Sequence, residues 1–205
     1  MIIIGLTGGV ASGKNFVADL FKRLSAHFSL AIFDADFCVH QIMSKNNLVL
    51  KQINKYFPQA IIAGTIDRKK LGDLVFADQK KLALLEKIIY PLLRKEQTKF
   101  IKQNHYQKRK MILLNIPLLF EKGYYKKCDK TIAVLSPQLI RKKRFIFRHR
   151  NDGLENRWQQ ITKNQFNDEK KKSRADYIIY NGLNKNFTAL QVKKIFKILI
   201  SKNKL

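Results

Sequence analysis

The part of this 205-residue chain best suited to chemistry is a glycine-rich segment near its N-terminus. Four residues separate Gly8 from Gly13, and Lys14 follows directly. Loops with this spacing wrap their backbone N–H groups around phosphate oxygens, and the lysine reaches the β- and γ-phosphates. The segment therefore predicts a site for a nucleoside triphosphate. Its predicted binding residues are Gly8, Gly9, Val10, Ala11, Ser12, Gly13, Lys14, Asn15 and Phe16.

The residue after the lysine departs from the usual pattern. A serine or threonine hydroxyl normally stands there and holds Mg²⁺, whereas this chain has Asn15. An amide oxygen is a hard ligand that can bind Mg²⁺ directly or through water. We therefore predict Asn15 as a metal ligand, with weaker or rearranged metal binding, and keep loss of activity as the alternative.

Two carboxylates follow a second apolar run, residues 30–33. Asp34 and Asp36 would lie at the carboxyl end of a strand, where ligands gather in open α/β sheets. In phosphoryl transfer to an alcohol, a carboxylate can accept the hydroxyl proton. Both could face the site if the chain stays extended through them. We predict Asp36 as the base and Asp34 as its alternative or as an indirect Mg²⁺ anchor; a turn that merely ends the strand is the structural alternative.

The elements that must position these residues alternate between strands and helices. Apolar spacing predicts a helix over residues 15–26, and a final amphipathic helix that carries Leu190, Ile195, Ile198 and Leu199. This alternation predicts an α/β fold with a mostly parallel five-stranded sheet flanked by helices. The predicted strands cover residues 2–7, 30–33, 111–116, 131–135 and 177–180.

The length fits a single domain, residues 1–205. Within it, the region after the second strand reads mainly as helices, most clearly at 81–89 and 92–101. This predicts a helical insert over about residues 37–105 that covers a substrate. Residues 138–174 are polar, basic and helical in pattern.

Composition limits the location and the partners. No apolar stretch approaches the roughly 18 to 20 residues that cross a bilayer, so we expect a cytoplasmic protein without membrane association. Cys38 and Cys128 form no CxxC pair, and we expect both to be reduced. The net charge of +26 would favour nucleic acid, but lysines are spread along nearly the whole chain. We therefore expect nucleic-acid binding to be non-specific if it occurs.

Several motifs occur together in an order that resembles dephospho-coenzyme A kinases. They are Gly5–Lys14, Asp34-Ala35-Asp36, Tyr90–Arg94, Pro117–Glu121 and Ala175–Ile179 with Asn181-Gly182. The resemblance implies a nucleotide-binding core, a coenzyme-binding insert and a lid over residues 138–174. It implies ATP as co-substrate, Mg²⁺, and phosphorylation of the 3′-hydroxyl of dephospho-coenzyme A, the last step of coenzyme A synthesis.

The resemblance also bears on the acceptor site. His40 could contact the acceptor's anionic groups, or could instead pack or cap a helix. Arg94 matches the family and could bind an acceptor phosphate or hold structure. Tyr90 stands where the family often has histidine, so this chain departs from the family pattern at one polar contact.

The family pattern places an arginine on a lid helix to balance charge on the migrating phosphoryl group. This chain offers Arg141, Arg144, Arg148 and Arg150. We predict Arg144 and Arg148, because they lie one helical turn apart and project from one face. A solvated basic face that binds nothing is the alternative.

Two other functions remain open from the sequence. A nucleoside or nucleotide kinase would use the same loop with a different acceptor pocket. A basic nucleic-acid-binding protein with a nucleotide switch would belong to another class, but no zinc-finger, RNP or homeodomain pattern is present. The sequence does not predict an oligomeric state.

Overall fold

The computed structural model describes residues 1–25, 28–149, 154–182 and 184–202. The chain forms two compact units. The first comprises Met1–Asp34 with Lys102–Leu205, and the second comprises Ala35–Ile101. Each unit is described by itself.

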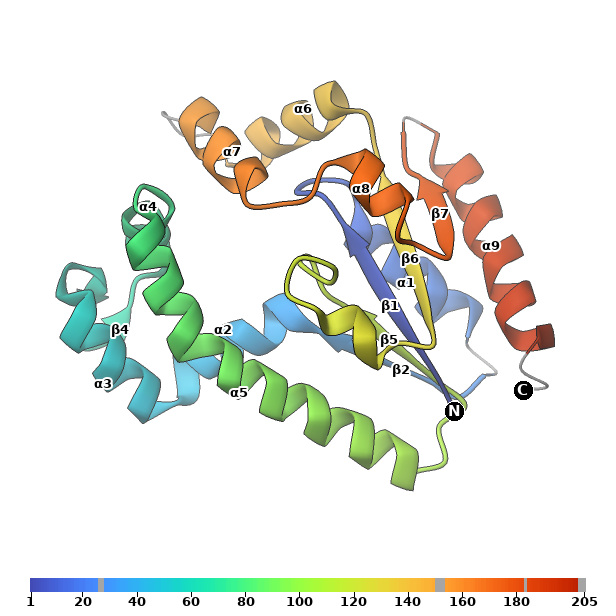
Figure 1. The fold of residues 1–205 in the computed structure, drawn as a ribbon, viewed down its shortest axis with the longest axis horizontal. Coiled ribbons are helices and arrows are strands. Elements are labelled where there is room, and N and C mark those ends of the chain that lie inside the picture. The colour runs from blue at the N-terminus through green and yellow to red at the C-terminus, as the bar shows by residue number, and fades with distance from the viewer. Residues whose placement is uncertain (26–27, 150–153, 183, 203–205) are drawn as a thin grey trace. The chain divides into compact units, whose positions relative to one another are not determined.

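The first unit is built on a five-stranded sheet in which every neighbouring pair is parallel (Figure 1). The strand order is β2-β5-β1-β6-β7. The bounds are β1 Ile2–Gly8, β2 Leu30–Asp34, β5 Met111–Asn115, β6 Lys130–Leu135 and β7 Tyr177–Tyr180. The predicted five-stranded α/β sheet is confirmed. Because all strands run the same way, their carboxyl ends meet at one edge.

Two helices, α1 (Lys14–Leu24) and α9 (Lys185–Lys202), pack against each other and against the apolar core of the sheet. The rings of Phe21 and Phe196 meet edge to face with centroids 6.0 Å apart. The prediction that Leu190 faces the core is wrong, since 64% of its surface is exposed. The buried stripe of α9 instead follows helical spacing through Val192, Ile195, Phe196 and Leu199, and Leu190 lies on the opposite side of the helix.

The basic region after β6 forms three helices, α6 (Gln138–His149), α7 (Leu154–Lys163) and α8 (Asp168–Lys172). Trp158 of α7 is buried, and its ring lies 5.5 Å from that of Phe145 on α6. This aromatic contact ties α7 to α6.

The second unit is mainly helical. Asn46 and Asp67 cap α3 and α4 by accepting backbone N–H bonds with their side chains. Two separate helices at 81–89 and 92–101 were the prediction, but one 28-residue helix, α5, runs through Pro91. Proline removes one donor of the helical ladder, and the surrounding turns carry the helix past it. The bounds are α2 Ala35–Lys45, α3 Asn47–Tyr56, η1 Pro58–Ala60, β3 Ile61–Ile62, β4 Thr65–Ile66, α4 Arg68–Phe76 and α5 Gln79–Tyr106.

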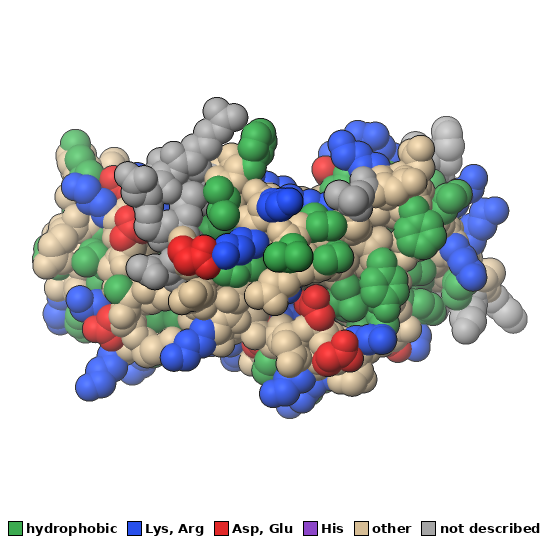
Figure 2. All heavy atoms as spheres, turned by 90° about the horizontal axis from the view of Figure 1, so that it is seen from above, with side chains coloured by type: hydrophobic (Ala, Val, Ile, Leu, Met, Phe, Trp, Pro, Cys, Tyr) green, Lys and Arg blue, Asp and Glu red, His purple; other side chains and the backbone are tan. Residues whose placement is uncertain are grey.

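The charged side chains on one face of the protein are mixed with side chains of other kinds (Figure 2). On the face shown in Figure 2, Lys and Arg side chains are interspersed with acidic, apolar and neutral polar groups. Among the described residues, no helix has both the length and the apolarity to cross a membrane.

Candidate active site

The glycine-rich loop joins the end of β1 to the start of α1 in the first unit. Gly13 stands at the N-cap of α1 with φ +85°, and no side chain caps the helix. The N–H of Ser12 donates to the carbonyl of Gly9 at 3.0 Å, which closes the turn. The positive end of the helix dipole is thus presented without an acidic residue in the first turn, an arrangement that suits an anion.

Asn181, the residue after β7, contacts the glycine-rich loop and holds it in place. Its buried Nδ2 donates to the carbonyl of Ser12 at 2.7 Å. Its Oδ1 accepts from the hydroxyl of Thr188 at 3.3 Å. A Cβ atom on Gly13 would collide with the Asn181 amide nitrogen. The loop and the end of β7 therefore fit only with glycine at position 13.

Replacing Gly13 with alanine should displace the loop. The variant would carry left-handed backbone strain of about 1–3 kcal/mol in addition to the collision with Asn181. We expect a lower melting temperature and at least about tenfold weaker ATP binding, because the loop amides lose their arrangement. Differential scanning fluorimetry and calorimetric titration measure both effects. Gly64→Ala is the matched control, since Gly64 also has positive φ but has nothing within 4 Å of an added Cβ. Equal loss of ATP binding in both variants would contradict this prediction.

The region after β6 reaches the same loop. The Oε1 of Gln165 accepts from the backbone N–H of Val10 at 2.9 Å. The guanidinium of Arg141 lies so close to Gly9 that a Cβ there would strike it. Arg141 also pairs with Asp168 at 3.6 Å. An amide oxygen and a cation from the predicted lid thus lie at the turn of the phosphate-binding loop.

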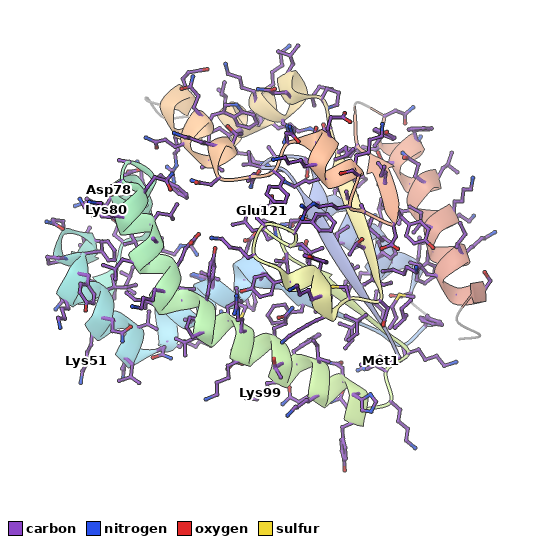
Figure 3. The ribbon with its side chains drawn as sticks, viewed as in Figure 1. Met1, Lys51, Asp78, Lys80, Lys99 and Glu121 are labelled. Carbon is purple, nitrogen blue, oxygen red and sulfur yellow. The ribbon has the colours of Figure 1, made fainter. Side chains whose placement is uncertain are left out.

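A buried ion pair fixes the chain that carries Gln165. Lys171 is fully buried, and its Nζ contacts Glu121 Oε1 at 2.7 Å and the carbonyl of Phe166 at 2.6 Å. Glu121 lies in the loop after β5 (Figure 3) and also accepts from the N–H of Phe166 at 2.8 Å. Burial lowers the pKa of Lys171, and the hydrogen bond and charge of Glu121 oppose that shift. These bonds hold Gln165 in register with the loop.

Of the predicted lid arginines, Arg144 is engaged within the protein. Its guanidinium donates to the hydroxyl of Ser136 and the carbonyl of Asn181, both at 3.3 Å, and to the carbonyl of Gly182 at 2.5 Å. Burial and then the positive charge of Arg148 lower the pKa of Arg144. Arg148 is exposed on the same helix, and Arg150 lies outside the described residues.

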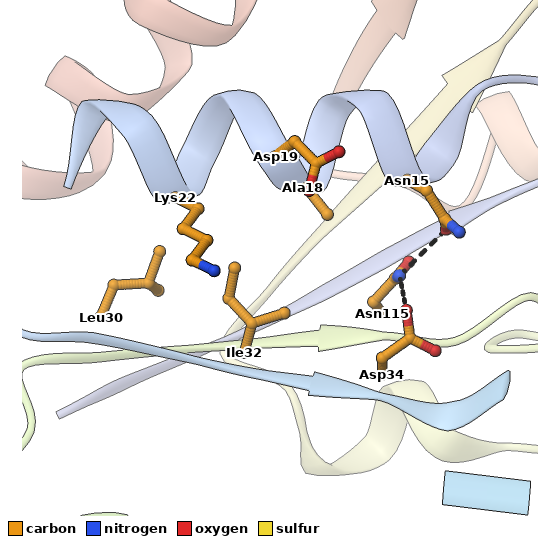
Figure 4. A pocket seen from close by; sticks show the side chains of 8 residues that line it. All are labelled: Asn15, Ala18, Asp19, Lys22, Leu30, Ile32, Asp34 and Asn115. Atoms are coloured by element: carbon orange, nitrogen blue, oxygen red, sulfur yellow. Dashed lines mark hydrogen bonds between the residues drawn. The ribbon is translucent and has the colours of Figure 1, made fainter. Parts of the chain in front are cut away.

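Four polar side chains from the start of α1 and the carboxyl ends of β2 and β5 form a connected group, and Figure 4 shows three of them, Asn15, Asp34 and Asn115. Lys14 is 8% exposed, and its Nζ donates to Asn115 Oδ1 at 2.5 Å and to Asn15 Oδ1 at 3.3 Å. Asn115 Nδ2 donates to Asp34 Oδ2 at 2.9 Å and to Asn15 Oδ1 at 3.2 Å. The group brings the loop lysine, the predicted metal ligand and the first predicted carboxylate together.

This group borders a cavity of about 500 Å³. Helix α1 and strand β2 supply its walls, as Figure 4 shows. The lining residues are Asn15, Ala18, Asp19, Lys22, Leu30, Ile32, Asp34 and Asn115.

The chain does not stay extended through Asp34 and Asp36, so the condition under which both would share a face of one strand is not met. Strand β2 ends at Asp34 and α2 begins at Ala35, so Asp36 is an exposed residue in the first turn of a helix. The chain turns from strand to helix between them, and the two residues belong to different units. The roles of both carboxylates stay predictions.

The other predicted acceptor residues lie in the second unit. His40 on α2 is exposed, and its Nδ1 lies 2.6 Å from a guanidinium nitrogen of Arg68. Arg94 is exposed on α5. The hydroxyl of Tyr90, also on α5, donates to Glu86 at 2.9 Å, an interaction within one helix. These contacts leave the predicted acceptor roles untested.

Sequence reasoning did not assign Asn115, Gln165 or Asn181 to the site. Asn115 had a usable signal, because it is a polar residue at the end of an apolar strand, the position already used to select Asp34. Asn181 belongs to the Asn181-Gly182 motif on which the family resemblance partly rests. Gln165 had no signal, since a single polar residue in a helical, polar segment does not indicate a long-range contact.

The side-chain oxygens of Asn15 and Asp34 suit a metal cation that is bound mainly by the phosphates of a nucleotide. No group of three or more His, Cys, Asp and Glu side chains that could hold a metal occurs in the described part of the chain. Mg²⁺ commonly takes one or two protein oxygens, substrate phosphates and several waters. The amide oxygen of Asn15 and the carboxylate of Asp34 fit that pattern.

A parallel five-stranded sheet with a glycine-rich loop between its first strand and first helix defines the P-loop class of nucleotide-binding proteins. The solved shikimate kinase of Acinetobacter baumannii shares this fold, with a TM-score of 0.54, 14% identity, and coverage of 98% of this chain and 94% of that one. A family model described as dephospho-CoA kinase matches residues 2–186. The chain belongs to the dephospho-CoA kinase family.

Individual relatives agree over nearly the full length. The dephospho-CoA kinase of Bartonella quintana is 39% identical over 200 residues, which cover 98% of this chain and 99% of the relative. The solved dephospho-CoA kinase of Campylobacter jejuni has a TM-score of 0.69 and 25% identity, and covers 98% of both chains. The resemblance predicted from the motifs is confirmed.

Proposed function

We propose that this protein phosphorylates the 3′-hydroxyl of dephospho-coenzyme A with ATP, giving coenzyme A and ADP in the last step of coenzyme A synthesis. The observation that carries the proposal is the contact of Lys14, at the start of α1, with the polar group at the ends of β2 and β5. It joins a phosphate-binding loop to a carboxylate at the sheet edge. Membership of the dephospho-CoA kinase family supplies the acceptor.

Different residues of the chain would serve nucleotide binding, metal binding, proton transfer and acceptor binding. The loop amides and Lys14 would bind and orient the β- and γ-phosphates of ATP. Asn15 and Asp34 would hold Mg²⁺, which when bound neutralises charge on the phosphate oxygens. Asp36 would accept the hydroxyl proton of the acceptor. His40 and Arg94 would bind the acceptor's anionic groups in the insert over about residues 37–105.

The lid, residues 138–174, would supply the final positive charge. Arg148 is our choice for the transition state, because it is exposed, whereas Arg144 donates to the carbonyls of Asn181 and Gly182. Closing of the lid would exclude water and limit hydrolysis of ATP.

Alanine substitutions at three arginines test this division. We expect Arg148→Ala to lower kcat by about 10²–10³ with little change in the KM for ATP. Arg144→Ala should instead lower the melting temperature and raise that KM, because the end of β7 loses its anchor. Arg141→Ala should weaken ATP binding at the Gly9 turn. Steady-state kinetics and thermal unfolding of the three variants separate these roles. A collapse of kcat in Arg141→Ala alone would transfer the transition-state role to Arg141.

The acceptor decides between this function and the main alternative. A coupled assay should detect ADP release from Mg·ATP with dephospho-coenzyme A, and much slower release with nucleosides and nucleotides. The product should be dephospho-coenzyme A phosphorylated at its 3′-hydroxyl, which is coenzyme A; mass spectrometry and comparison with authentic coenzyme A identify it. A nucleoside or nucleotide turned over faster than dephospho-coenzyme A would overturn the proposal. The cytoplasmic location stays a prediction.

The nucleic-acid-binding alternative gains no support from the family match. The lysines and arginines of the visible face are interspersed with other side chains (Figure 2). We expect any binding to nucleic acid to be weak and to vanish with salt, as is usual for non-specific contacts with phosphates.

A further inference from the structure

Both the NH₂ group and the oxygen of the Asn115 amide are hydrogen-bonded in this structure. Its two N–H bonds go to Asp34 Oδ2 at 2.9 Å and to Asn15 Oδ1 at 3.2 Å, and its oxygen accepts from Lys14 Nζ at 2.5 Å. The reverse orientation would place the amide oxygen against two other acceptors and the NH₂ group against an ammonium. The surroundings of Asn115 therefore determine which way its amide points.

The residue types around Asn115 differ from those that usually hold Mg²⁺ in P-loop enzymes. Those enzymes hold Mg²⁺ with the Ser or Thr that follows the loop lysine and with an aspartate. Here Asn15 stands in the hydroxyl position, and the strand end beside it carries Asn115. The two amides are bonded to each other, so a change at one removes a partner of the other. An aspartate at position 115 would direct only acceptors at Asp34 and Asn15.

We propose that Asn15 and Asn115 are a matched carboxamide pair, in which Asn15 replaces the usual hydroxyl of the metal subsite and Asn115 occupies the strand end beside it. Asn115 is a positioning residue: it holds the Asp34 carboxylate and the Asn15 oxygen ready for the divalent cation carried by the nucleotide. The cavity of about 500 Å³ beside the three residues has room for the waters that Mg²⁺ retains (Figure 4). The inference rests on the proposed binding of ATP.

The pair has an electrostatic consequence. A carboxamide adds no negative charge, so it neither repels a triphosphate without metal nor attracts the metal strongly. Asp34 is then the single carboxylate that Asn115 contacts, so ATP affinity should rise less on adding Mg²⁺ in wild type than in Asn115→Asp. In Asn115→Asp, the added carboxylate should weaken ATP binding in EDTA by about tenfold and restore it in Mg²⁺.

Fluorescence titration with N-methylanthraniloyl-ATP in Mg²⁺ and in EDTA measures this ratio. Asn186→Asp is the matched control, because it adds the same charge at an exposed position in the first turn of α9. We expect the ratio of the two affinities to rise only in Asn115→Asp. Equal ratios in wild type, Asn115→Asp and Asn186→Asp would overturn the proposal.

Asn15→Ser tests whether Asn115 depends on the amide of Asn15, and it does so without changing Asn115 itself. Restoring the hydroxyl alone should weaken Mg·ATP binding, because Asn115 loses an acceptor. If the positions were independent, the same change would tighten binding. The double variant Asn15→Ser/Asn115→Asp should bind Mg·ATP more tightly than is expected from multiplying the fold-changes in affinity of the two single variants. Additive effects would overturn the pairing.

Titration of nucleotide-free protein with Mn²⁺, followed by electron paramagnetic resonance, gives a readout independent of nucleotide and acceptor. Asn115→Asp should bind Mn²⁺ at least about tenfold more tightly than wild type, since two carboxylates then face one cation. Adding Asp34→Asn should abolish the gain. Unchanged Mn²⁺ affinity would overturn the inference, whereas failure of wild type to bind ATP would overturn the proposed function instead.

Discussion

Replacement of Lys14 by alanine is expected to lower kcat by at least about a thousandfold. Lys14 is almost fully buried at the start of α1, with its ammonium 2.5 Å from Asn115 Oδ1. This position places a fixed positive charge where the β- and γ-phosphates would lie beside the loop. Its removal leaves the charge that develops on the migrating group without its nearest protein cation.

The coupled ADP-release assay with dephospho-coenzyme A measures the loss. Lys194→Ala is the matched control, because Lys194 is an exposed lysine of α9 and should leave kcat unchanged. Circular dichroism and thermal unfolding establish that the Lys14 variant is folded. Retention of more than a tenth of wild-type turnover in that variant would show that the ammonium is not needed for phosphoryl transfer.

Asp36→Asn is expected to lower kcat by about 10²–10⁴, the usual contribution of a general base, with little effect on ATP binding. Asparagine keeps the size of the side chain but cannot accept the proton. Asp34→Asn should act differently, because Asp34 is bonded to Asn115 and would serve the metal. It should raise the Mg²⁺ concentration needed for half-maximal rate.

Rates measured across a Mg²⁺ series distinguish the two carboxylates. Glu96→Gln, an exposed neutralisation on α5, is the control for loss of one negative charge. A large fall in kcat at saturating Mg²⁺ for Asp34→Asn, with near-normal rates for Asp36→Asn, would assign the base to Asp34.

The cysteines illustrate how environment changes a side chain that sequence alone leaves ordinary. Neither Cys38 nor Cys128 is in a disulfide. Burial, followed by the negative charges of Asp129 and Asp176, raises the pKa of Cys128 to about 12. Cys128 is therefore almost entirely a protonated thiol near neutral pH, which makes it a poor nucleophile.

Local patterns determined most of the fold of this protein. The apolar runs predicted all five strands of the sheet because buried parallel strands require continuous apolar residues on both faces. The apolar patterns were less informative for the helices than for the strands. The helix through Pro91 and the exposed Leu190 were misread, since spacing alone does not show what covers each face.

The sequence by itself determined the phosphate-binding loop, because its backbone geometry depends on glycines and a lysine that are neighbours in the chain. Only the tertiary structure decided what surrounds that loop. Gln165 reaches Val10 across 155 positions, Asn181 reaches Ser12 across 169, and Asn115 reaches Lys14 across 101. Such contacts follow from the order of strands in the sheet and from the path of the lid, and no local spacing of residues encodes them.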